Sequence, residues 1–275
     1  MKFKRLGVRV LVAIVGIPAI IFLVIMGRLP FALFVATAIG LAQLEFYHMV
    51  DQKGINSSKL IGILFGVLTP ALFYYRGIEE FWLLILIATV CILIVELFRN
   101  VKDALLNTAA SIMGILYPAL FFSFMVLIRE LPHKMNQDYR QGAFWIIGFV
   151  AAVWVCDTAA YFIGSWIGRV KLFERVSPNK TVEGAVAGFI FAVLTGYLVH
   201  LIILQDVPII HLIVVSAIAG SVGQFGDLVE SLFKRDVGIK DSSNLLPGHG
   251  GVLDRFDSLF LVAPIVYLYI RFVIF

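Results

Sequence analysis

Residues 82–98 read WLLILIATVCILIVELF, a run of seventeen residues in which Glu96 is the single charged side chain. A helix needs about 20 apolar residues to cross the ~30 Å hydrocarbon core of a bilayer, so this run is close to spanning length. Strands of a membrane barrel alternate in polarity over shorter stretches, so an unbroken run predicts a helix. Comparable runs cover residues 8–26, 31–50, 60–75, 82–98, 108–128, 143–165, 182–203, 208–232 and 258–275. We therefore predict an all-α integral membrane protein with about nine transmembrane helices.

The composition agrees with a chain embedded in the bilayer. Of its 275 residues, 61% are hydrophobic and 15% are charged, whereas soluble domains have about 25% charged residues. The net charge of +4 comes from lysines and arginines that border the apolar runs, so we expect no nucleic-acid partner. Cys91 and Cys156 lie far apart inside apolar runs, which argues against a disulfide framework or a zinc knuckle. Residues 8–26 are longer than a usual signal-peptide core, and we interpret them as a retained first helix.

The basic residues predict an orientation. If nine spans alternate across the membrane, sixteen of the 22 lysines and arginines fall on the side of the amino terminus. The positive-inside rule then places the amino terminus in the cytoplasm and the carboxyl terminus outside. We expect residues 1–140 to form a scaffold of about five helices in the cell (inner or plasma) membrane. Residues 141–275 would form a catalytic region with cytoplasmic loops at 165–184 and 234–257.

Five acidic residues interrupt the predicted spans. A charge at the centre of a membrane helix costs about 2.5–3.5 kcal/mol on insertion scales, so such residues usually face a partner or a wet cavity. We interpret Glu45 and Glu96 as snorkelling to the interface. We assign Asp157 and Asp227 to function, in a cavity open to the cytoplasm. The five are Glu45, Glu96, Asp157, Asp227 and Glu230.

Small residues recur along two of the later spans. Glycine and alanine at regular spacing let membrane helices approach closely, and this is the interpretation we favour. They are Gly184, Gly188, Ala217, Gly220, Gly223 and Gly226.

The two long loops combine basic residues with tight backbone. Residues 247–251 read PGHGG, and the N–H groups of consecutive glycines can form an anion-binding concavity. Lysine and arginine beside them suit phosphate, although an ordinary positive-inside loop is the alternative. The two loops together hold Arg169, Lys171, Arg175, Lys180, Lys234, Arg235, Lys240, His249 and Arg255, and the candidate glycines are Gly248, Gly250 and Gly251.

Carboxylates accompany these basic residues and suggest a metal ion. Asp227 and Glu230 lie one turn apart at the end of the eighth span, and Asp254 and Asp257 lie one turn apart at the entry to the ninth. Hard oxygen ligands without a cysteine or histidine cluster favour Mg²⁺, usually shared with substrate phosphates. The residues alone thus predict Mg²⁺-dependent phosphotransfer at the cytoplasmic surface.

The same stretches resemble a known family. Residues 231–257, SLFKRDVGIKDSSNLLPGHGGVLDRFD, closely resemble the signature of the phosphatidate cytidylyltransferases, the CDP-diacylglycerol synthases. Residues 156–164 (CDTAAYFIG) and 176–184 (VSPNKTVEG) resemble two further stretches of that family. The first 140 residues match only in being apolar spans, and Cys156-Asp157-Thr158 varies slightly on an expected Ala-Asp-Ser.

The resemblance implies that CTP and phosphatidate react to give CDP-diacylglycerol and pyrophosphate. It implies that Asp227 and Asp254 bind Mg²⁺, alone or with a second cation, with Asp157, Glu230 and Asp257 as further candidates. The triphosphate and the lipid phosphate would be neutralised by Lys180, Lys234, Arg235, Lys240, His249 and Arg255. Phosphate or nucleotide would be positioned by Ser177, Asn179 and Thr181. The family also implies a homodimer in the lipid bilayer.

Two other functions remain open on sequence alone. A CTP-dependent kinase of polyprenol or phytol type shares the character of the SPNKTVEG loop, but the long signature at 231–257 argues against it. A transporter for an anionic solute would also use intramembrane acids. Transporters usually show internal repeats with paired broken helices, whereas here the polar residues gather in one half of the chain.

Overall fold

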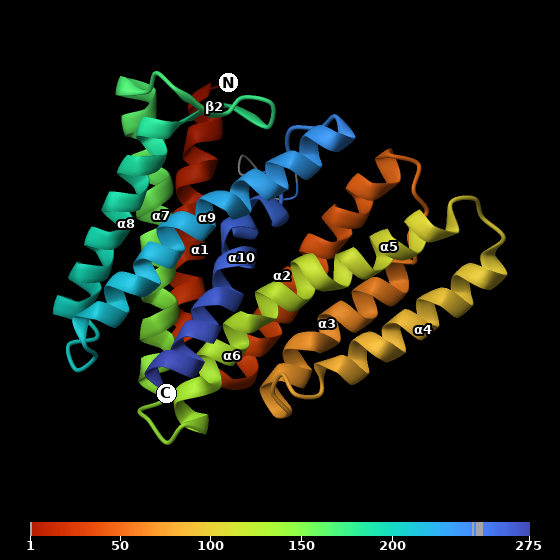
Figure 1. Cartoon of the computed structure of the whole chain (residues 1–275), viewed down its shortest axis with the longest axis horizontal. Helices are drawn as coiled ribbons and strands as arrows, with labels where there is room; N and C mark the ends of the chain where they lie inside the picture. Colours follow the sequence, from red (N-terminus) through yellow and green to blue (C-terminus); the bar gives the residue numbers. More distant parts are fainter. Residues whose placement is uncertain (1, 244, 246–249) are drawn as a thin grey trace. The chain divides into compact units, whose positions relative to one another are not determined.

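The computed structural model describes residues 2–243, 245 and 250–275, with side chains from residue 14 onward (Figure 1). Its secondary structure is almost entirely helical. The helices are α1 (Lys2–Met26), α2 (Arg28–Gln52), α3 (Lys59–Tyr75), α4 (Phe81–Arg99), α5 (Ala104–Gly114), the π-helical η1 (Ile115–Leu120), α6 (Phe121–Lys134), α7 (Arg140–Ile167), α8 (Val182–Ile202), α9 (Ile209–Val237), α10 (Leu253–Tyr269) and the π-helical η2 (Ile270–Ile274).

All nine predicted runs fall on helices, with α5, η1 and α6 together forming one of them. In the described part of the chain, seven of these helices are long and apolar enough to cross a membrane. Lys59–Tyr75 is a shorter apolar helix, and Ile14–Met26 is the apolar part of α1 for which side chains are described. The protein is therefore an integral membrane protein of helical class, and the orientation of its termini stays a prediction.

The loop between α7 and α8 contains two strands that form a small sheet, which the all-α prediction did not include. Strand β1 (Lys171–Phe173) pairs antiparallel with β2 (Ser177–Thr181), with Lys171 opposite Thr181. Thr181 ends the hairpin and begins α8, because its hydroxyl accepts a hydrogen bond of 3.2 Å from the N–H of Gly184. This is the side-chain capping expected of threonine at a helix start. The hairpin thus leads directly from a basic loop into a membrane helix.

The second long loop is shorter than predicted. Helix α9 continues to Val237 and α10 begins at Leu253, so the connecting segment covers residues 238–252 instead of 234–257. The predicted span at 258–275 starts five residues too late. Asp254 and Asp257 consequently lie in the first turns of α10.

The chain divides into two compact units. Unit 1 comprises residues 1–127 and 236–256, and unit 2 comprises residues 128–235 and 257–275. These units are defined by contacts between residues. The scaffold at 1–140 and the catalytic region at 141–275 were defined by their expected roles, and that division stays a prediction.

Polar side chains tie together the helices of unit 1. The buried amide of Gln43 on α2 donates to the carbonyl oxygens of Gly62 on α3 and Gly114 on α5, at 2.9 and 2.8 Å. The hydroxyl of Tyr47 donates to the carbonyl of Ser111 at 2.8 Å. These hydrogen bonds fix α2, the helix that also carries Glu45.

Close packing by glycine brings together α7 and α8 in unit 2. A Cβ atom at Gly188 would lie 2.8 Å from the carbonyl oxygen of Cys156, and one at Gly184 would lie 2.6 Å from that of Ala160. Both distances are too short for a side chain, so the backbones approach as closely as glycine allows. The close packing predicted for these glycines is confirmed, and it sets the hairpin at one end of α7 and α8.

Candidate active site

Three carboxylates from three helices of unit 2 form what we call the acidic cluster: Asp157 on α7, Asp227 on α9 and Asp257 on α10. The charge of Asp227 acts on both of the others, and that of Asp257 acts on Asp157. Gly226 permits this meeting, because a Cβ atom there would lie 2.7 Å from the carbonyl oxygen of Asp257. Three mutually repelling carboxylates need a positive partner.

One positive partner is Lys180. Its ammonium nitrogen lies 2.6 Å from a carboxylate oxygen of Asp227, and its charge also acts on Asp157. The hydroxyl of Ser231 lies 3.3 Å from the other oxygen of Asp227. The structure thus brings Lys180 of the 176–184 stretch together with Asp227 on α9, and the charge of Lys180 acts on Asp157 of the 156–164 stretch. Their side chains remain about one-third exposed at the ion pair, 29% for Lys180 and 31% for Asp227.

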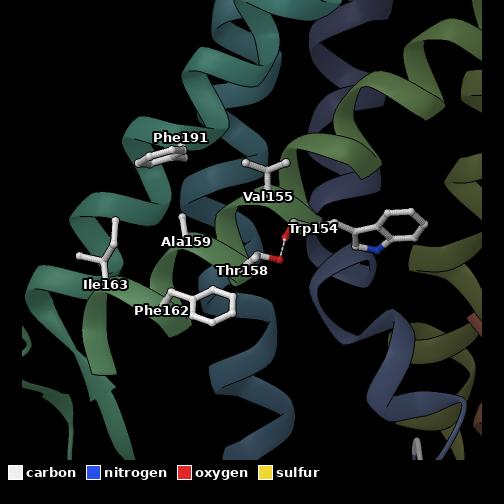
Figure 2. Close-up of a pocket in the computed structure, with 7 residues that line it drawn as sticks. All are labelled: Trp154, Val155, Thr158, Ala159, Phe162, Ile163 and Phe191. Carbon is white, nitrogen blue, oxygen red and sulfur yellow. Dashed lines mark hydrogen bonds between the residues drawn. The ribbon is translucent and has the colours of Figure 1, made fainter. Parts of the chain in front are cut away.

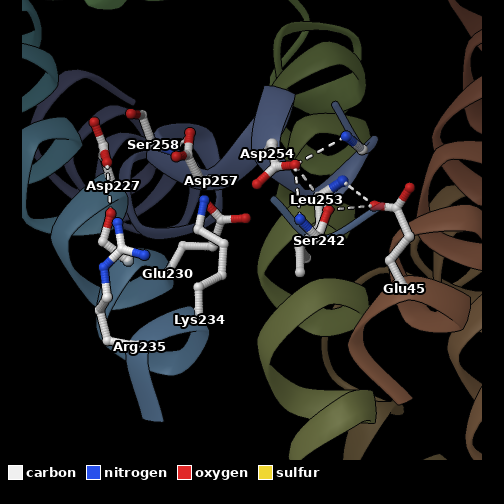
Figure 3. Close-up of polar contacts among 12 residues, drawn as sticks. Glu45, Asp227, Glu230, Lys234, Arg235, Ser242, Leu253, Asp254, Asp257 and Ser258 are labelled. Atoms are coloured by element: carbon white, nitrogen blue, oxygen red, sulfur yellow. Dashed lines mark hydrogen bonds and ion pairs between the residues drawn. The ribbon is translucent and has the colours of Figure 1, made fainter. Parts of the chain in front are cut away.

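Glu230 and Lys234 form a second ion pair one turn further along α9. The distance between them is 2.9 Å, and the Glu230 side chain is completely buried (Figure 3). Arg235 donates from Nε to the carbonyl oxygen of Val176 at 3.3 Å, which holds the hairpin against α9. Both basic residues predicted for phosphate therefore also contact the protein itself.

Asp254, in unit 1, organises the loop that precedes α10. One of its carboxylate oxygens accepts hydrogen bonds from the N–H of Ser242 at 3.0 Å, from the hydroxyl of Ser242 at 2.9 Å and from the N–H of Gly251 at 2.8 Å (Figure 3). A Cβ atom at Gly251 would overlap Ser242 and Glu45. Asp254 is thus held in place by backbone and by serine, as a preorganised carboxylate.

Glu45 is a residue of this loop network that sequence reasoning missed. We interpreted it as snorkelling to the membrane interface, but its side chain is buried and accepts hydrogen bonds from the N–H groups of Val252 and Leu253. Glu96 does not snorkel either, since it is buried beside Asn107 and Arg99. In the sequence, Glu45 and Glu96 stand out only as acidic residues within apolar runs. That pattern does not identify the residues they contact.

The other predicted residues lie on the hairpin and the loop. Thr181 caps α8, Asn179 is exposed and Ser177 is half-buried on β2. Lys240 and Arg255 are exposed. Gly250 has a φ of 80°, the left-handed conformation that glycine adopts readily. Gly248 and His249 lie outside the described residues.

The donor set fits a hard cation that phosphates help to bind. Among the described residues, no group of three or more His, Cys, Asp or Glu side chains is arranged to hold a metal ion by itself. Mg²⁺ typically takes one or two carboxylates and completes its octahedron with water and substrate phosphates. The acidic cluster, with an excess of negative charge over Lys180, is chemically suited to that arrangement.

An apolar groove of about 400 Å³ lies between α7 and α8 in unit 2 (Figure 2). Two of its lining residues carry a polar side-chain group, the indole N–H of Trp154 and the hydroxyl of Thr158, and this hydroxyl donates to the carbonyl of Trp154 at 2.7 Å. The groove therefore offers hydrocarbon contact and no site for phosphate. Its lining residues are Trp154, Val155, Thr158, Ala159, Phe162, Ile163 and Phe191.

Comparisons with known proteins point to one family. The model of the cytidylyltransferase family matches residues 7–273. A phosphatidate cytidylyltransferase of Bacillus subtilis is 32% identical over 268 residues, covering 94% of this chain and 95% of its own. Proteins of the same name from Staphylococcus saprophyticus and Synechocystis are 33% and 31% identical, covering 94% and 95% of this chain and 96% and 95% of their own.

Proposed function

The chain belongs to the cytidylyltransferase family, and we propose that it transfers the cytidylyl group of CTP to phosphatidate, giving CDP-diacylglycerol and pyrophosphate. Membership makes it a nucleotidyltransferase, and the apolar helices make it an integral membrane enzyme. The observation that carries the proposal is the contact of Lys180, from the SPNKTVEG loop, with Asp227 at the acidic cluster. Lysine beside hard carboxylates suits a triphosphate and its cation.

The nucleophile in this reaction needs little activation. A phosphate monoester has a second pKa near 6, so the lipid phosphate is largely a dianion at neutral pH. One of its oxygens attacks the α-phosphorus of CTP, and the bond from that phosphorus to the bridging oxygen of the pyrophosphate breaks. The reaction therefore needs no general base. We propose that the acidic cluster instead acts by its negative charge and by its position.

The main barrier is the approach of one anion to another. We propose that Lys180 neutralises phosphate while it remains paired with Asp227, and that the exposed Lys240 and Arg255 contribute further positive charge. We propose that Asp227 and Asp254 bind Mg²⁺, with Asp157, Glu230 and Asp257 as further candidate ligands. When bound, Mg²⁺ would neutralise and orient the phosphates of CTP.

We further propose that the site faces the cytoplasm, where CTP is available. Sixteen of the 22 lysines and arginines fall on that side under the alternating topology, and the hairpin and the 238–252 loop are among the segments that carry them. A homodimer in the cell membrane is the assembly implied by the family resemblance.

The destination of a radioactive label tests the reaction. Purified protein is incubated with Mg²⁺, phosphatidate and either [α-³²P]CTP or [γ-³²P]CTP, and lipid is extracted. We expect the α-label in lipid and the γ-label in pyrophosphate. Transfer of the γ-label to lipid would make the protein a lipid kinase. Absence of transfer with any divalent metal, together with uptake of CTP or phosphate into proteoliposomes, would make it a transporter.

A further inference from the structure

We propose that Glu45 on α2 is a positioning residue of the reaction, which holds Ser242, Ser243 and the first turn of α10 so that Asp254 is correctly placed. Its effect on turnover rests on the proposed function, whereas its effect on the loop does not. The inference concerns unit 1 alone, since all the residues involved belong to it.

Glu45 accepts hydrogen bonds at both of its carboxylate oxygens, and each oxygen has one backbone donor and one hydroxyl donor. Oε1 accepts from the N–H of Val252 at 3.0 Å and from the hydroxyl of Ser243 at 2.5 Å. Oε2 accepts from the N–H of Leu253 at 2.7 Å and from the hydroxyl of Ser242 at 3.1 Å. Four donors on one side chain make this a built anchor.

The two backbone donors explain why an acid is needed here. Val252 and Leu253 stand at the start of α10, where N–H groups have no partner within the helix. The helix dipole also favours negative charge at this end. Glu45 is 5% exposed, so its carboxylate is largely removed from water. The backbone donors and the positive end of the α10 dipole replace the lost hydration. A neutral side chain of the same size would lose both contributions.

Ser242 and Gly251 connect the anchor to Asp254. The hydroxyl of Ser242 lies 3.1 Å from Glu45 and 2.9 Å from Asp254, and because it carries a single proton it donates to one carboxylate at a time (Figure 3). The N–H of Gly251 donates to Asp254, and a Cβ atom at Gly251 would overlap both Ser242 and Glu45. Movement of Glu45 would therefore move the groups that hold Asp254.

Glu96 offers a matched control within the same unit. It is also a buried glutamate in an apolar helix, 7% exposed. Its hydrogen-bond partners in the described part of the chain are Asn107 at 2.7 Å and Arg99 at 3.3 Å, which lie on α5 and α4. Loss of its charge would disturb the packing of α4 and α5 and leave the α10 loop unchanged.

The test compares Glu45→Gln with Glu96→Gln in the full-length protein. A glutamine at position 45 turns its NH₂ group toward one backbone N–H and one hydroxyl, which places donor against donor. Two quantities are measured: the rate of trypsin cleavage after the exposed Lys240, and kcat with KM for CTP from transfer of the α-label. For Glu45→Gln we expect cleavage at least about fivefold faster and kcat at least about tenfold lower, since small misplacements of reacting groups have effects of this size. Glu96→Gln should change neither.

Ser243→Ala is a milder variant, which keeps the test informative if Glu45→Gln fails to fold. Ser243→Ala removes one of the four donors and should give a loosened loop with a fall in kcat of about twofold to fivefold, between the wild type and Glu45→Gln. Unchanged cleavage in both loop variants would overturn the anchor. Faster cleavage with unchanged kcat would overturn the positioning role. If the unaltered protein transferred no cytidylyl group, the proposed function would fail, while the trypsin comparison would still decide whether Glu45 holds the loop.

Discussion

Lys180 and Asp227 form an ion pair of 2.6 Å that joins the β hairpin to helix α9. Exposed ion pairs contribute about 0–1 kcal/mol to stability, and both side chains here are nearly one-third exposed, so stability alone does not account for the arrangement. The pair places one cation at Asp227, where its charge also acts on Asp157, and we propose that phosphates and a metal ion bind there. The roles proposed for Asp227, in binding Mg²⁺, and for Lys180, in binding phosphate, can be measured separately.

Asp227→Asn should lower turnover at least about a hundredfold, which corresponds to about 2.7 kcal/mol of lost transition-state stabilisation. Asparagine keeps the shape and removes the charge that would hold Mg²⁺, so raising Mg²⁺ should restore activity only in part. The measurement is the initial rate of α-label transfer across a Mg²⁺ series. Asp206→Asn, at an exposed position between α8 and α9, serves as the control and should be neutral. Near-normal activity of Asp227→Asn at low Mg²⁺ would make Asp227 structural.

Lys180→Ala should act mainly on binding. Loss of its charge should raise KM for CTP at least about fivefold and leave the Mg²⁺ requirement unchanged, because lysine contacts phosphate as a point charge. Lys171→Ala, an exposed position on β1 of the same hairpin, should have a much smaller effect. Since Lys180 and Asp227 touch, their effects should not add in the double variant. Strict additivity would mean that the ion pair has no part in the reaction.

Asp254→Asn should remove a proposed Mg²⁺ ligand and also weaken the loop before α10, whereas Asp227→Asn should remove a Mg²⁺ ligand only. Its carboxylate oxygen accepts three hydrogen bonds from the loop, so we expect a fall in turnover of at least about a hundredfold, or about 2.7 kcal/mol, together with faster trypsin cleavage after Lys240. Asp227→Asn should leave that cleavage unchanged. Equal cleavage of the two variants and the wild type would show that Asp254 does not organise the loop.

Much of the fold could be predicted from apolar run length alone. The runs at 31–50 and 82–98 fall inside α2 and α4, because every residue of a membrane helix must suit the bilayer or the helix bundle. The helix ends were less predictable. The start of α10 at Leu253 was placed at 258, since its first turn carries Asp254 and Asp257 and looks like loop by polarity.

The candidate site was also only partly predictable from sequence. Sequence motifs identified Lys180 and Asp227, but their contact depends on tertiary packing that no spacing reveals. Glu45 lies about 200 positions from the residues it binds. Its apolar surroundings and single charge also describe Glu96, which has an unrelated set of partners. Local sequence indicates that a buried acid needs donors, and only the fold shows which donors it finds.

The proposed orientation predicts which side of the membrane each loop faces. In a variant with Cys91 and Cys156 replaced by alanine, Lys171→Cys and Lys240→Cys should react with a maleimide only from the cytoplasmic side. Arg76→Cys, after α3, should react from outside. An impermeant maleimide applied to intact cells, and then to inverted vesicles, distinguishes the two sides. Labelling of position 171 or 240 in intact cells would reverse the topology and separate the site from CTP.

Gly226→Ala should damage the acidic cluster through packing alone. Its Cβ atom would lie 2.7 Å from the carbonyl oxygen of Asp257 and 2.9 Å from the Cα atom of Ser258. Both are backbone atoms, so α9 and α10 would have to separate at that point. Overpacking of this kind typically costs about 1–3 kcal/mol, and we expect a lower thermal midpoint and a turnover reduced at least about tenfold.

Gly223→Ala is the matched control on the same helix. There the nearest atom to a Cβ is a methyl carbon of Val262 at 3.5 Å, an ordinary contact. Alanine favours a helix over glycine by up to about 1 kcal/mol, so this variant should be as stable as the wild type or slightly more stable, with normal turnover. Thermal unfolding followed by tryptophan fluorescence, together with the α-label assay, measures both quantities. If Gly223→Ala and Gly226→Ala behaved alike, the approach of α9 to Asp257 would not be what fixes the position of that carboxylate.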